Sequence, residues 1–275
     1  MNITATQVNE LRKLTGAGMM DCKNALVESG GDTQQAIDYL RKKGQKIAAK
    51  RADRNATEGV VLSKTSADKQ YGAVVMINCE TDFVAKNADF VAFAQSILDL
   101  AIEKRIKTVE DLKVAQLNDR TVEETIVEKT GVIGEKIEIG AFGIVEAAFV
   151  SSYIHQGNRL ATIVGLSKAF AAAEKLGHEL AMQIAAMDPV AVDEKDVPAD
   201  IIAREIEVGK EQAREEGKPE AMLEKIAQGK LTRFFRDNTL LNQDSILDNK
   251  KSVRQHIAEQ DKDVTVTEFI RVKLG

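Results

Sequence analysis

The 275-residue sequence contains no tryptophan, and aromatic residues make up only 4% of it. Any buried core must therefore be mainly aliphatic, and a hydrophobic content of 44% is enough to build one. Charged residues account for 29%, which indicates extensive solvated helix surface rather than disorder. The length favours two or three structural units of unequal size.

Cysteine is also scarce: Cys22 and Cys79 are the only two, and they lie far apart. This count excludes a disulfide scaffold, the spacing gives no metal-binding pair, and both facts fit a reducing compartment. No apolar run reaches the roughly 18 residues of a membrane span. The first residues are polar and amphipathic, unlike a signal or transit peptide. We therefore expect a cytoplasmic protein.

Positive charge is in slight deficit, with 38 Lys and Arg against 43 Asp and Glu, a net charge of −5. This balance argues against nucleic acid as the main ligand, because phosphate binding needs a net or clustered positive field. One basic cluster does occur, between residues 41 and 54, where Asp53 is the only acid. No aromatic residues are interleaved there to stack on bases. We therefore favour a solvated helix end that runs into a linker over a nucleic-acid patch.

Signatures of catalysis are missing as well. His155, His178 and His256 are scattered, and Met182 stands where a zinc-protease helix starting at His178 would need its second histidine. No phosphate-binding loop or nucleophile elbow is present. The many carboxylates lie among basic neighbours on helix faces, which is typical of solvated surface. We expect neither an enzyme nor a resident cofactor or metal ion.

Residues 4–43 are predicted to form three short helices. Thr4 is a candidate N-cap, followed by a stripe of Val8, Leu11 and Leu14. Gly16-Ala17-Gly18 separates the first helix from the second, and Asp32 is the expected N-cap of the third. With its basic linker, this small N-terminal domain spans residues 1–55.

From residue 57 the hydrophobic period changes to that of strands. The pattern predicts a hairpin, then helices and a strand, and then a similar order of strand, turn, strand and helix. The predicted segments are a hairpin at 60–78, helix at 90–101, helix across 108–135, strands at 137–146, 147–155 and 160–167, and helix at 171–187. We interpret this order as an internal duplication with two related sheet-plus-helix subdomains.

All three prolines fall within residues 189–219, near two charged amphipathic helices at 199–215 and 219–236. Their thin apolar stripes predict an antiparallel helical hairpin, inserted at 189–236. The alternating segment 264–272 is expected to return as a strand to the second sheet. The predicted fold class is therefore α+β. The first subdomain spans 56–146, and the second combines 147–188 with 237–275.

Two segments are candidates for function. The first contains Met19 and Met20, adjacent methionines beside the glycine turn of a very small unit. Methionine is adaptable and common at surfaces where proteins dock. The alternative is that both side chains close the miniature core, and the sequence alone leaves the two readings open.

The second candidate is the segment from Thr81 to Asn87, which follows a buried-looking strand and precedes a helix. A strand-to-helix turn held by a rigid body is a common place for functional residues. Phe83 in this turn is either a hydrophobic staple for the next helix or an exposed wedge.

Five segments resemble the bacterial elongation factor Ts family in sequence and order. They are LRKLTGAGMMDCKNALVESGGDTQQAIDYLRKKG from Leu11 to Gly44, TDFVAKNADF from Thr81 to Phe90, SYIHQGNRLA from Ser152 to Ala161, QGKLTRFF from Gln228 to Phe235, and EFIRVKLG from Glu268 to Gly275. The resemblance implies a guanine-nucleotide exchange factor for elongation factor Tu, the GTPase that brings aminoacyl-tRNA to the ribosome. It also implies an N-terminal domain of the ubiquitin-associated type.

The same resemblance implies which residues contact that partner. Asp82 and Phe83, flanked by Thr81 and Val84, would press against the GTPase near its Mg²⁺ and phosphate site so that GDP leaves. The N-terminal contacts would be Arg12, Met19, Met20 and Lys23, and His155 would contribute from the second half. A three-helix adaptor of the ubiquitin-associated type is the alternative, but the intact Thr81–Val84 motif argues against adaptor binding as the whole function.

Overall fold

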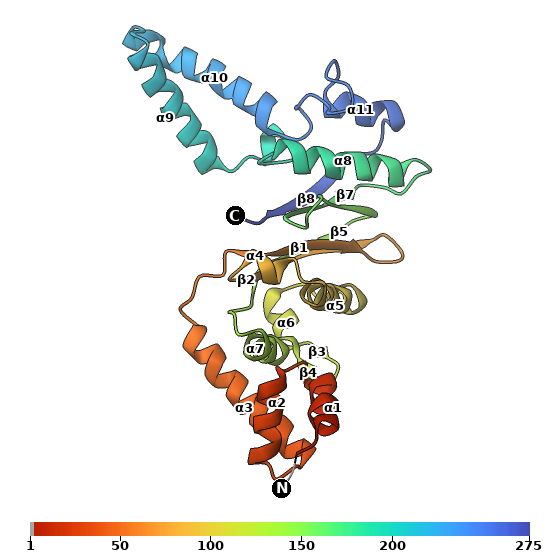
Figure 1. Cartoon of the computed structure of the whole chain (residues 1–275). Helices are drawn as coiled ribbons and strands as arrows, with labels where there is room; N and C mark the ends of the chain where they lie inside the picture. The colour runs from red at the N-terminus through yellow and green to blue at the C-terminus, as the bar shows by residue number, and fades with distance from the viewer. Residues whose placement is uncertain (1–2) are drawn as a thin grey trace. The chain divides into compact units, whose positions relative to one another are not determined.

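The structure is a computed structural model that describes residues 3–275. The predicted α+β class is confirmed, since the described residues form eleven α-helices and small antiparallel sheets (Figure 1). None of the helices in residues 3–275 has both the length and the apolar character needed to cross a membrane. The chain divides into two compact units. The first contains Met1–Leu62, Val75–Gly143 and Lys273–Gly275, and the second contains Ser63–Val74 and Ile144–Val272.

The first unit begins with helices α1 (Ala5–Thr15), α2 (Met19–Glu28) and α3 (Thr33–Arg51). Both predicted caps are present: the Thr4 hydroxyl accepts from the backbone N–H of Gln7, and Asp32 accepts from that of Gln35. The core between the helices is small and mainly aliphatic, with Val8, Leu11, Ala17, Cys22, Ala25, Leu26 and Ala36 buried.

Two expectations for these helices are wrong. Leu14 is exposed, because six residues of helix rotate its side chain about 120° away from Val8. Residues 44–51 of the basic stretch are helix rather than linker, because α3 continues through Arg51. The glycine at position 44 does not end α3, and its Cα lies against Gly131 of α7 (Val122–Ile133).

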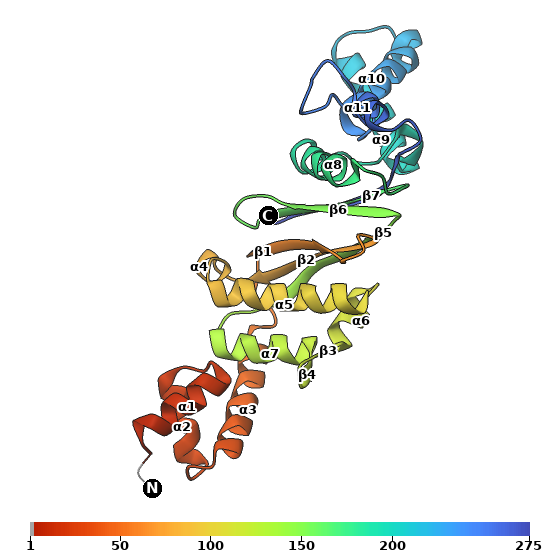
Figure 2. The ribbon, with the colours of Figure 1, turned by 90° about the vertical axis from the view of Figure 1, so that its right-hand side faces the viewer.

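Strands β1 (Glu58–Thr65), β2 (Tyr71–Cys79) and β5 (Glu138–Glu146) form a three-stranded sheet in the order β1-β2-β5. β2 is buried along nearly its whole length, as its largely apolar sequence indicates. Helix α4 (Asp82–Ala85) follows β2, and α5 (Ala88–Lys104) buries Phe90, Phe93, Ala94, Ile97, Leu98 and Ala101, the residues of the predicted helical stripe. In Figures 1 and 2, α5 runs along the β2 side and α7 lies beyond it.

The prediction of helix across residues 108–135 is wrong for the middle of that range. The range divides into α6 (Val109–Val114), a small hairpin of β3 (Gln116–Leu117) and β4 (Arg120–Thr121), and then α7. Asn118 adopts a positive φ of 60° at the tip of that hairpin. Thr121 and Glu124 then form a complete capping box, which starts α7 as a separate helix.

A second sheet, in the order β6-β7-β8, is formed by β6 (Phe149–Ile154), β7 (Leu160–Leu166) and β8 (Val266–Lys273), all of whose residues except Lys273 belong to the second unit. β6 and β7 pair antiparallel, from Phe149 opposite Leu166 to Ile154 opposite Ala161. Helix α8 (Ala173–Met187) packs on these two strands (Figure 2). The sequence analysis missed α11 (Val253–Gln260), whose Val253 and Ile257 belong to the same core as α8.

Helices α9 (Ala199–Glu215) and α10 (Leu223–Asn238) pack against each other, with the short helices η1 (Glu194–Asp196) before α9 and η2 (Glu220–Met222) before α10. Their seam is narrow and includes the buried Ala213, Ala227 and Leu231. Ion pairs border it, at 2.8 Å between Lys210 and Glu224 and at 3.3 Å between Lys230 and Glu216.

Two glycines of this helix pair should respond oppositely to substitution. A Cβ on Gly209 would lie 3.2 Å from the Cα of Ala227, whereas a Cβ on Gly229 would meet nothing within 4 Å. Gly209→Leu should therefore force the helices apart and lower the free energy of unfolding by about 1–3 kcal/mol. Gly229→Ala should raise it by about 0.5–1 kcal/mol, because alanine loses less backbone entropy than glycine. Urea unfolding of the full chain measures both, and equal effects would contradict this packing.

Candidate functional site

The Thr81–Val84 segment forms the junction between β2 and α5. Thr81 is the N-cap of α4, and its hydroxyl accepts from the N–H of Val84 at 3.5 Å. Asp82, Phe83 and Val84 therefore lie on a single helical turn within the predicted strand-to-helix connection. Within residues 3–275, no group of three or more His, Cys, Asp or Glu side chains could hold a metal ion.

Phe83 projects into solvent with 84% of its surface exposed. The staple alternative is therefore wrong: the inward-facing residues at this junction are Ala85 and Phe90. An exposed aromatic ring on a short ordered helix is a large apolar surface available for docking. Of the two readings of Phe83, the wedge is the one consistent with the structure.

Asp82 stands beside Phe83 and is held ionised. Lys86 donates a hydrogen bond to its carboxylate at 2.6 Å, and that bond together with the charge of Lys86 keeps the pKa of Asp82 below its ordinary value. The pair is exposed and spans one helical turn, so it adds little to stability and can open when another group approaches. Asp82 therefore presents a negative charge next to an apolar ring.

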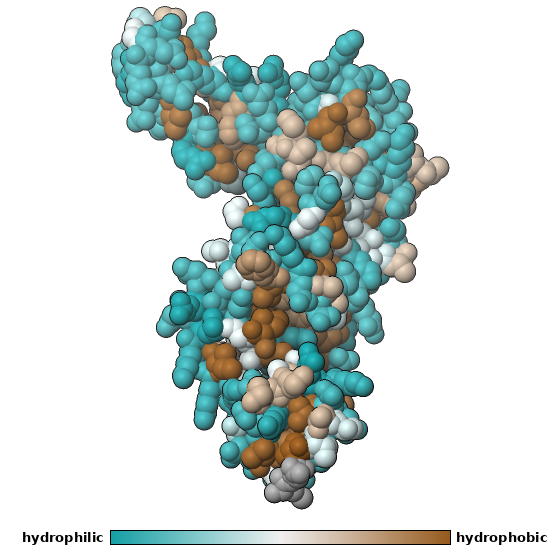
Figure 3. All heavy atoms as spheres, viewed as in Figure 1, coloured by the Kyte–Doolittle hydropathy of each residue, from teal (hydrophilic) through white to brown (hydrophobic). Residues whose placement is uncertain are grey.

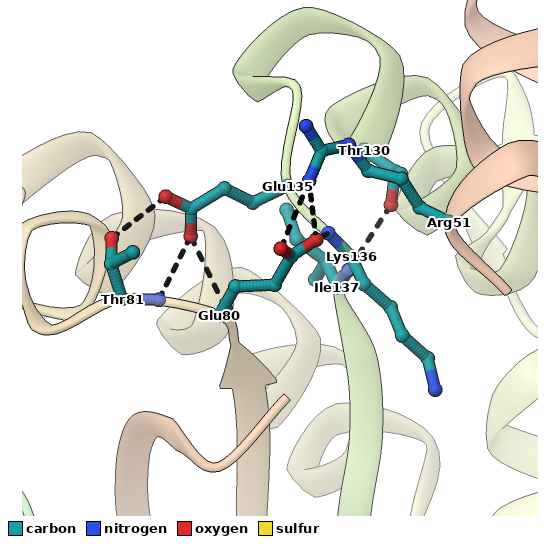
Figure 4. A network of polar contacts seen from close by, with 7 residues as sticks. All are labelled: Arg51, Glu80, Thr81, Thr130, Glu135, Lys136 and Ile137. Atoms are coloured by element: carbon teal, nitrogen blue, oxygen red, sulfur yellow. Dashed lines mark hydrogen bonds and ion pairs between the residues drawn. The ribbon is translucent and has the colours of Figure 1, made fainter. Parts of the chain in front are cut away.

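A polar network fixes the base of this turn (Figure 4). The Glu135 carboxylate accepts from the N–H of Glu80 at 3.2 Å, the N–H of Thr81 at 3.0 Å and the Thr81 hydroxyl at 2.7 Å. In return, the Glu80 carboxylate accepts the N–H of Lys136 at 2.6 Å and two hydrogen bonds from Arg51 at 2.8 and 2.9 Å. The sequence analysis missed Arg51, Glu80 and Glu135 as members of the site.

This network should make stability sensitive to acid. The N–H of Lys136, followed by the Arg51 guanidinium, lowers the pKa of Glu80 from its ordinary value of 4.5. A lowered folded-state pKa stabilises the fold above pH 4.5, and that stabilisation is lost as the pH falls below 4.5. Glu80→Gln should therefore be less stable than the unchanged protein at pH 7, with the gap closing below about pH 4.5. Urea unfolding over a pH series tests this, and a gap independent of pH would contradict it.

The N-terminal candidates lie on α1 and α2. Met19 and Met20 are 55% and 62% exposed, so the alternative in which both close the small core is wrong. Arg12 and Lys23 are exposed on the same two helices. Leu14 and Val27, which the sequence analysis did not propose as contacts, are also exposed, and apolar atoms reach the surface over these helices in Figure 3. We call Leu14, Met19, Met20 and Val27 the methionine patch.

A groove of about 570 Å³ lies within the first unit, mainly between α5 and α7. Val84 lines it from α4, and Gly16 lines it from the loop that leads into α2. Phe93 of α5 and Val132 of α7 form much of its apolar wall. Neither Phe83 nor the proposed N-terminal contacts Met19 and Met20 line this groove.

His155 belongs to the second unit, where it is exposed immediately after β6. Its Nδ1 lies 3.0 Å from the hydroxyl of Tyr153, and the two rings are tilted with centroids 6.0 Å apart. Tyr153 also meets His178 edge to face, with centroids 5.7 Å apart. Tyr153 therefore orients His155, a role that the sequence analysis did not assign.

Comparison with known proteins shows the family to which the chain belongs. The family model described as "Elongation factor TS" matches residues 80–275. The chain is 53% identical to elongation factor Ts of Christiangramia forsetii over 273 residues, covering 99% of each chain. It is 51% identical to that of Flavobacterium psychrophilum, again over 99% of each, and 48% identical to that of Amoebophilus asiaticus over 100% of each. Over essentially its whole length, the chain belongs to the elongation factor Ts family of translation elongation factors.

Proposed function

We propose that this chain is a guanine-nucleotide exchange factor that binds elongation factor Tu in its GDP form and promotes release of GDP, so that GTP can be loaded. The observation that carries the proposal is the pairing of Phe83, 84% exposed, with the ionised Asp82 on one ordered turn. An exposed apolar ring beside a negative charge offers a partner both apolar area to bury and a carboxylate that can pair with cationic groups. The chain performs no bond chemistry in this role.

The chemistry of the turn suggests how GDP is displaced. A nucleotide site that holds Mg²⁺ and phosphate depends on close, ordered contacts between opposite charges. Phe83 adds volume next to such a site, and Asp82 adds a negative charge that competes with phosphate for cationic groups. Both changes weaken the hold on Mg²⁺ and GDP more than they weaken the factor's own contacts.

Energetics require a second contact. By linkage, GDP must weaken binding of the factor by the same ratio that the factor weakens binding of GDP. Shifting a population from 1:99 to 99:1 takes about 5.5 kcal/mol of differential affinity. Burying one phenylalanine ring supplies roughly 1.5–3 kcal/mol. The exposed residues Arg12, Met19, Met20 and Lys23 are the proposed second contact, and His155 is the proposed contact of the second unit.

The predicted subdivision of the chain belongs to the same proposal. We infer an N-terminal three-helix domain with its basic stretch at 1–55, and sheet-plus-helix subdomains at 56–146 and at 147–188 with 237–275. The insert at 189–236 would be an antiparallel hairpin, supported by the packing and ion pairs of α9 and α10. A factor that serves translation in this way would act in the cytoplasm.

Affinity measurements with and without nucleotide test the proposal. Isothermal titration of elongation factor Tu should give tight binding when the GTPase is free of nucleotide. Excess GDP with Mg²⁺ should weaken that binding by at least about a hundredfold, which corresponds to about 2.7 kcal/mol of coupling. Equal affinity for the two forms would reject an exchange role, even if the two proteins bind.

A further inference from the structure

We propose that Glu135 is a positioning residue that, together with Glu80, clamps the Thr81–Val84 turn in the geometry needed for docking, and that Arg51 ties helix α3 to this clamp. The inference rests on the proposed function, because it gives the purpose of the clamp as the presentation of Phe83. Arg51, Glu80 and Glu135 are all partly buried.

The contacts of Glu135 are concentrated on the base of the turn. One carboxylate oxygen accepts the N–H groups of both Glu80 and Thr81, and the other accepts the Thr81 hydroxyl (Figure 4). That hydroxyl also caps α4 by accepting from Val84. Glu135 therefore holds the residue from which the helix of Asp82 and Phe83 begins.

Glu80 completes the clamp in the opposite direction. Its N–H donates to Glu135, while its carboxylate accepts from the N–H of Lys136, the residue after Glu135. The junction between β2 and α4 is thus bonded reciprocally to the junction between α7 and β5. A single contact would leave the turn free to rotate about it, whereas this pair of contacts fixes its direction as well as its place.

The segment 135–137, which bonds to the turn, is itself held in place by α7. The Ile137 N–H donates to the hydroxyl of Thr130 at 3.2 Å, and Thr130 is buried in α7. The segment that bonds to the turn is therefore anchored to a packed helix. A clamp built on an anchored segment can transmit the rigidity of the core to an exposed residue.

Arg51 adds an outer connection. It is the last residue of α3, and its guanidinium makes both hydrogen bonds to Glu80 through Nη1. The Glu80 side chain is only 18% exposed, so this pair is better shielded from solvent than the surface pair of Asp82 and Lys86. The helix that carries the N-terminal domain is consequently joined to the turn that carries Phe83.

The consequence is energetic. A turn that is ordered before docking avoids the conformational entropy that a flexible turn would lose on binding. Hydrogen bonds to a charged group are the stronger kind, and Glu135 makes three of them to this turn. Removing Glu135 should leave Phe83 present but poorly directed, so the loss should appear in the rate of nucleotide release at saturating factor.

The clamp itself can be measured without a partner by hydrogen–deuterium exchange of the full chain. In Glu135→Ala, the amides of Glu80 and Thr81 should exchange roughly tenfold faster or more, with amides of β6 and β7 unchanged. Glu138→Ala is the matched control, because that carboxylate lies on the same segment but pairs with Lys136 at 3.0 Å instead of with the turn. Unchanged exchange at Glu80 and Thr81 in Glu135→Ala would overturn the clamp.

Release of GDP from elongation factor Tu tests the positioning role. Glu135→Ala should lower the maximal release rate roughly tenfold, and Glu135→Gln should recover most of it. Glutamine can rescue because its carbonyl can accept both backbone N–H groups and its NH₂ can donate to the Thr81 hydroxyl. Glu138→Ala should match the unchanged protein. A Gln variant as slow as the Ala variant would contradict positioning by these hydrogen bonds.

A double-mutant comparison identifies what the clamp positions. If Glu135 acts through Phe83, Glu135→Ala should have little further effect on release in a Phe83→Ala background. A full tenfold effect in that background would overturn the assignment. If the unchanged protein fails to accelerate release at all, the proposed function is rejected, and the exchange of the Glu80 and Thr81 amides still decides separately whether the clamp exists.

Discussion

Phe83→Ala should slow factor-promoted GDP release from elongation factor Tu by roughly ten- to a hundredfold. The expected size follows from the ring, whose burial against a partner is worth about 1.5–3 kcal/mol, since each 1.36 kcal/mol is a factor of ten in rate. Because the ring is 84% exposed in the free protein, its removal leaves no cavity. The midpoint of urea unfolding should therefore stay where it is.

The measurement is the release rate of fluorescent GDP over a range of factor concentrations. Leu247→Ala is a suitable control, because Leu247 is an exposed aliphatic residue of the second unit outside the proposed contacts. Asp82→Ala should slow release in the same assay, and the double variant should be slower than either single one. Full exchange activity in the double variant would remove both residues from the mechanism.

The double substitution Met19→Ser and Met20→Ser should weaken binding of elongation factor Tu by a hundredfold or more, on the order of 3 kcal/mol. Each methionine exposes more than half of its surface in the free protein and offers a flexible apolar chain to a partner. Neither contributes to the buried core of the three helices, so the variant should fold normally.

Titration calorimetry with nucleotide-free elongation factor Tu measures this loss. Val114→Ser, at an exposed valine of α6 in the same unit, controls for a general effect of removing surface apolar groups. We expect its affinity to match that of the unchanged protein. Unchanged affinity of the methionine variant would mean that the methionine patch serves no docking role.

The sequence predicts the regular elements well where local signals agree with packing. The apolar stripe of α5 and the capping residues Thr4 and Asp32 all lie where their local chemistry indicates. The error across 108–135 arises because continuous helical composition outweighed a local start signal, the capping box of Thr121 and Glu124. Helix α11 was missed because it is short and has only two buried residues. Two apolar residues do not make a recognisable helical stripe, and their burial depends on the core that they join.

Part of the candidate site is likewise identifiable from local sequence, and the rest depends on tertiary contacts. Thr81–Val84 is identifiable from its place after a buried strand and from family resemblance. Whether Phe83 packs inward or projects outward depends on tertiary contacts, which local sequence does not contain. Glu135 acts on residues 54 and 55 positions earlier, and it is one of 43 acidic residues in the chain. Nothing in its local sequence distinguishes it from a solvated glutamate, so only the fold reveals its role.

The most direct test of the account is stopped-flow release of fluorescent GDP from elongation factor Tu, with and without this protein. We predict acceleration that rises with factor concentration and then saturates, and that is largely lost in Phe83→Ala. Release at the spontaneous rate at every concentration would contradict the exchange function. Acceleration undiminished in Phe83→Ala would contradict the assignment of this turn as the element that displaces the nucleotide.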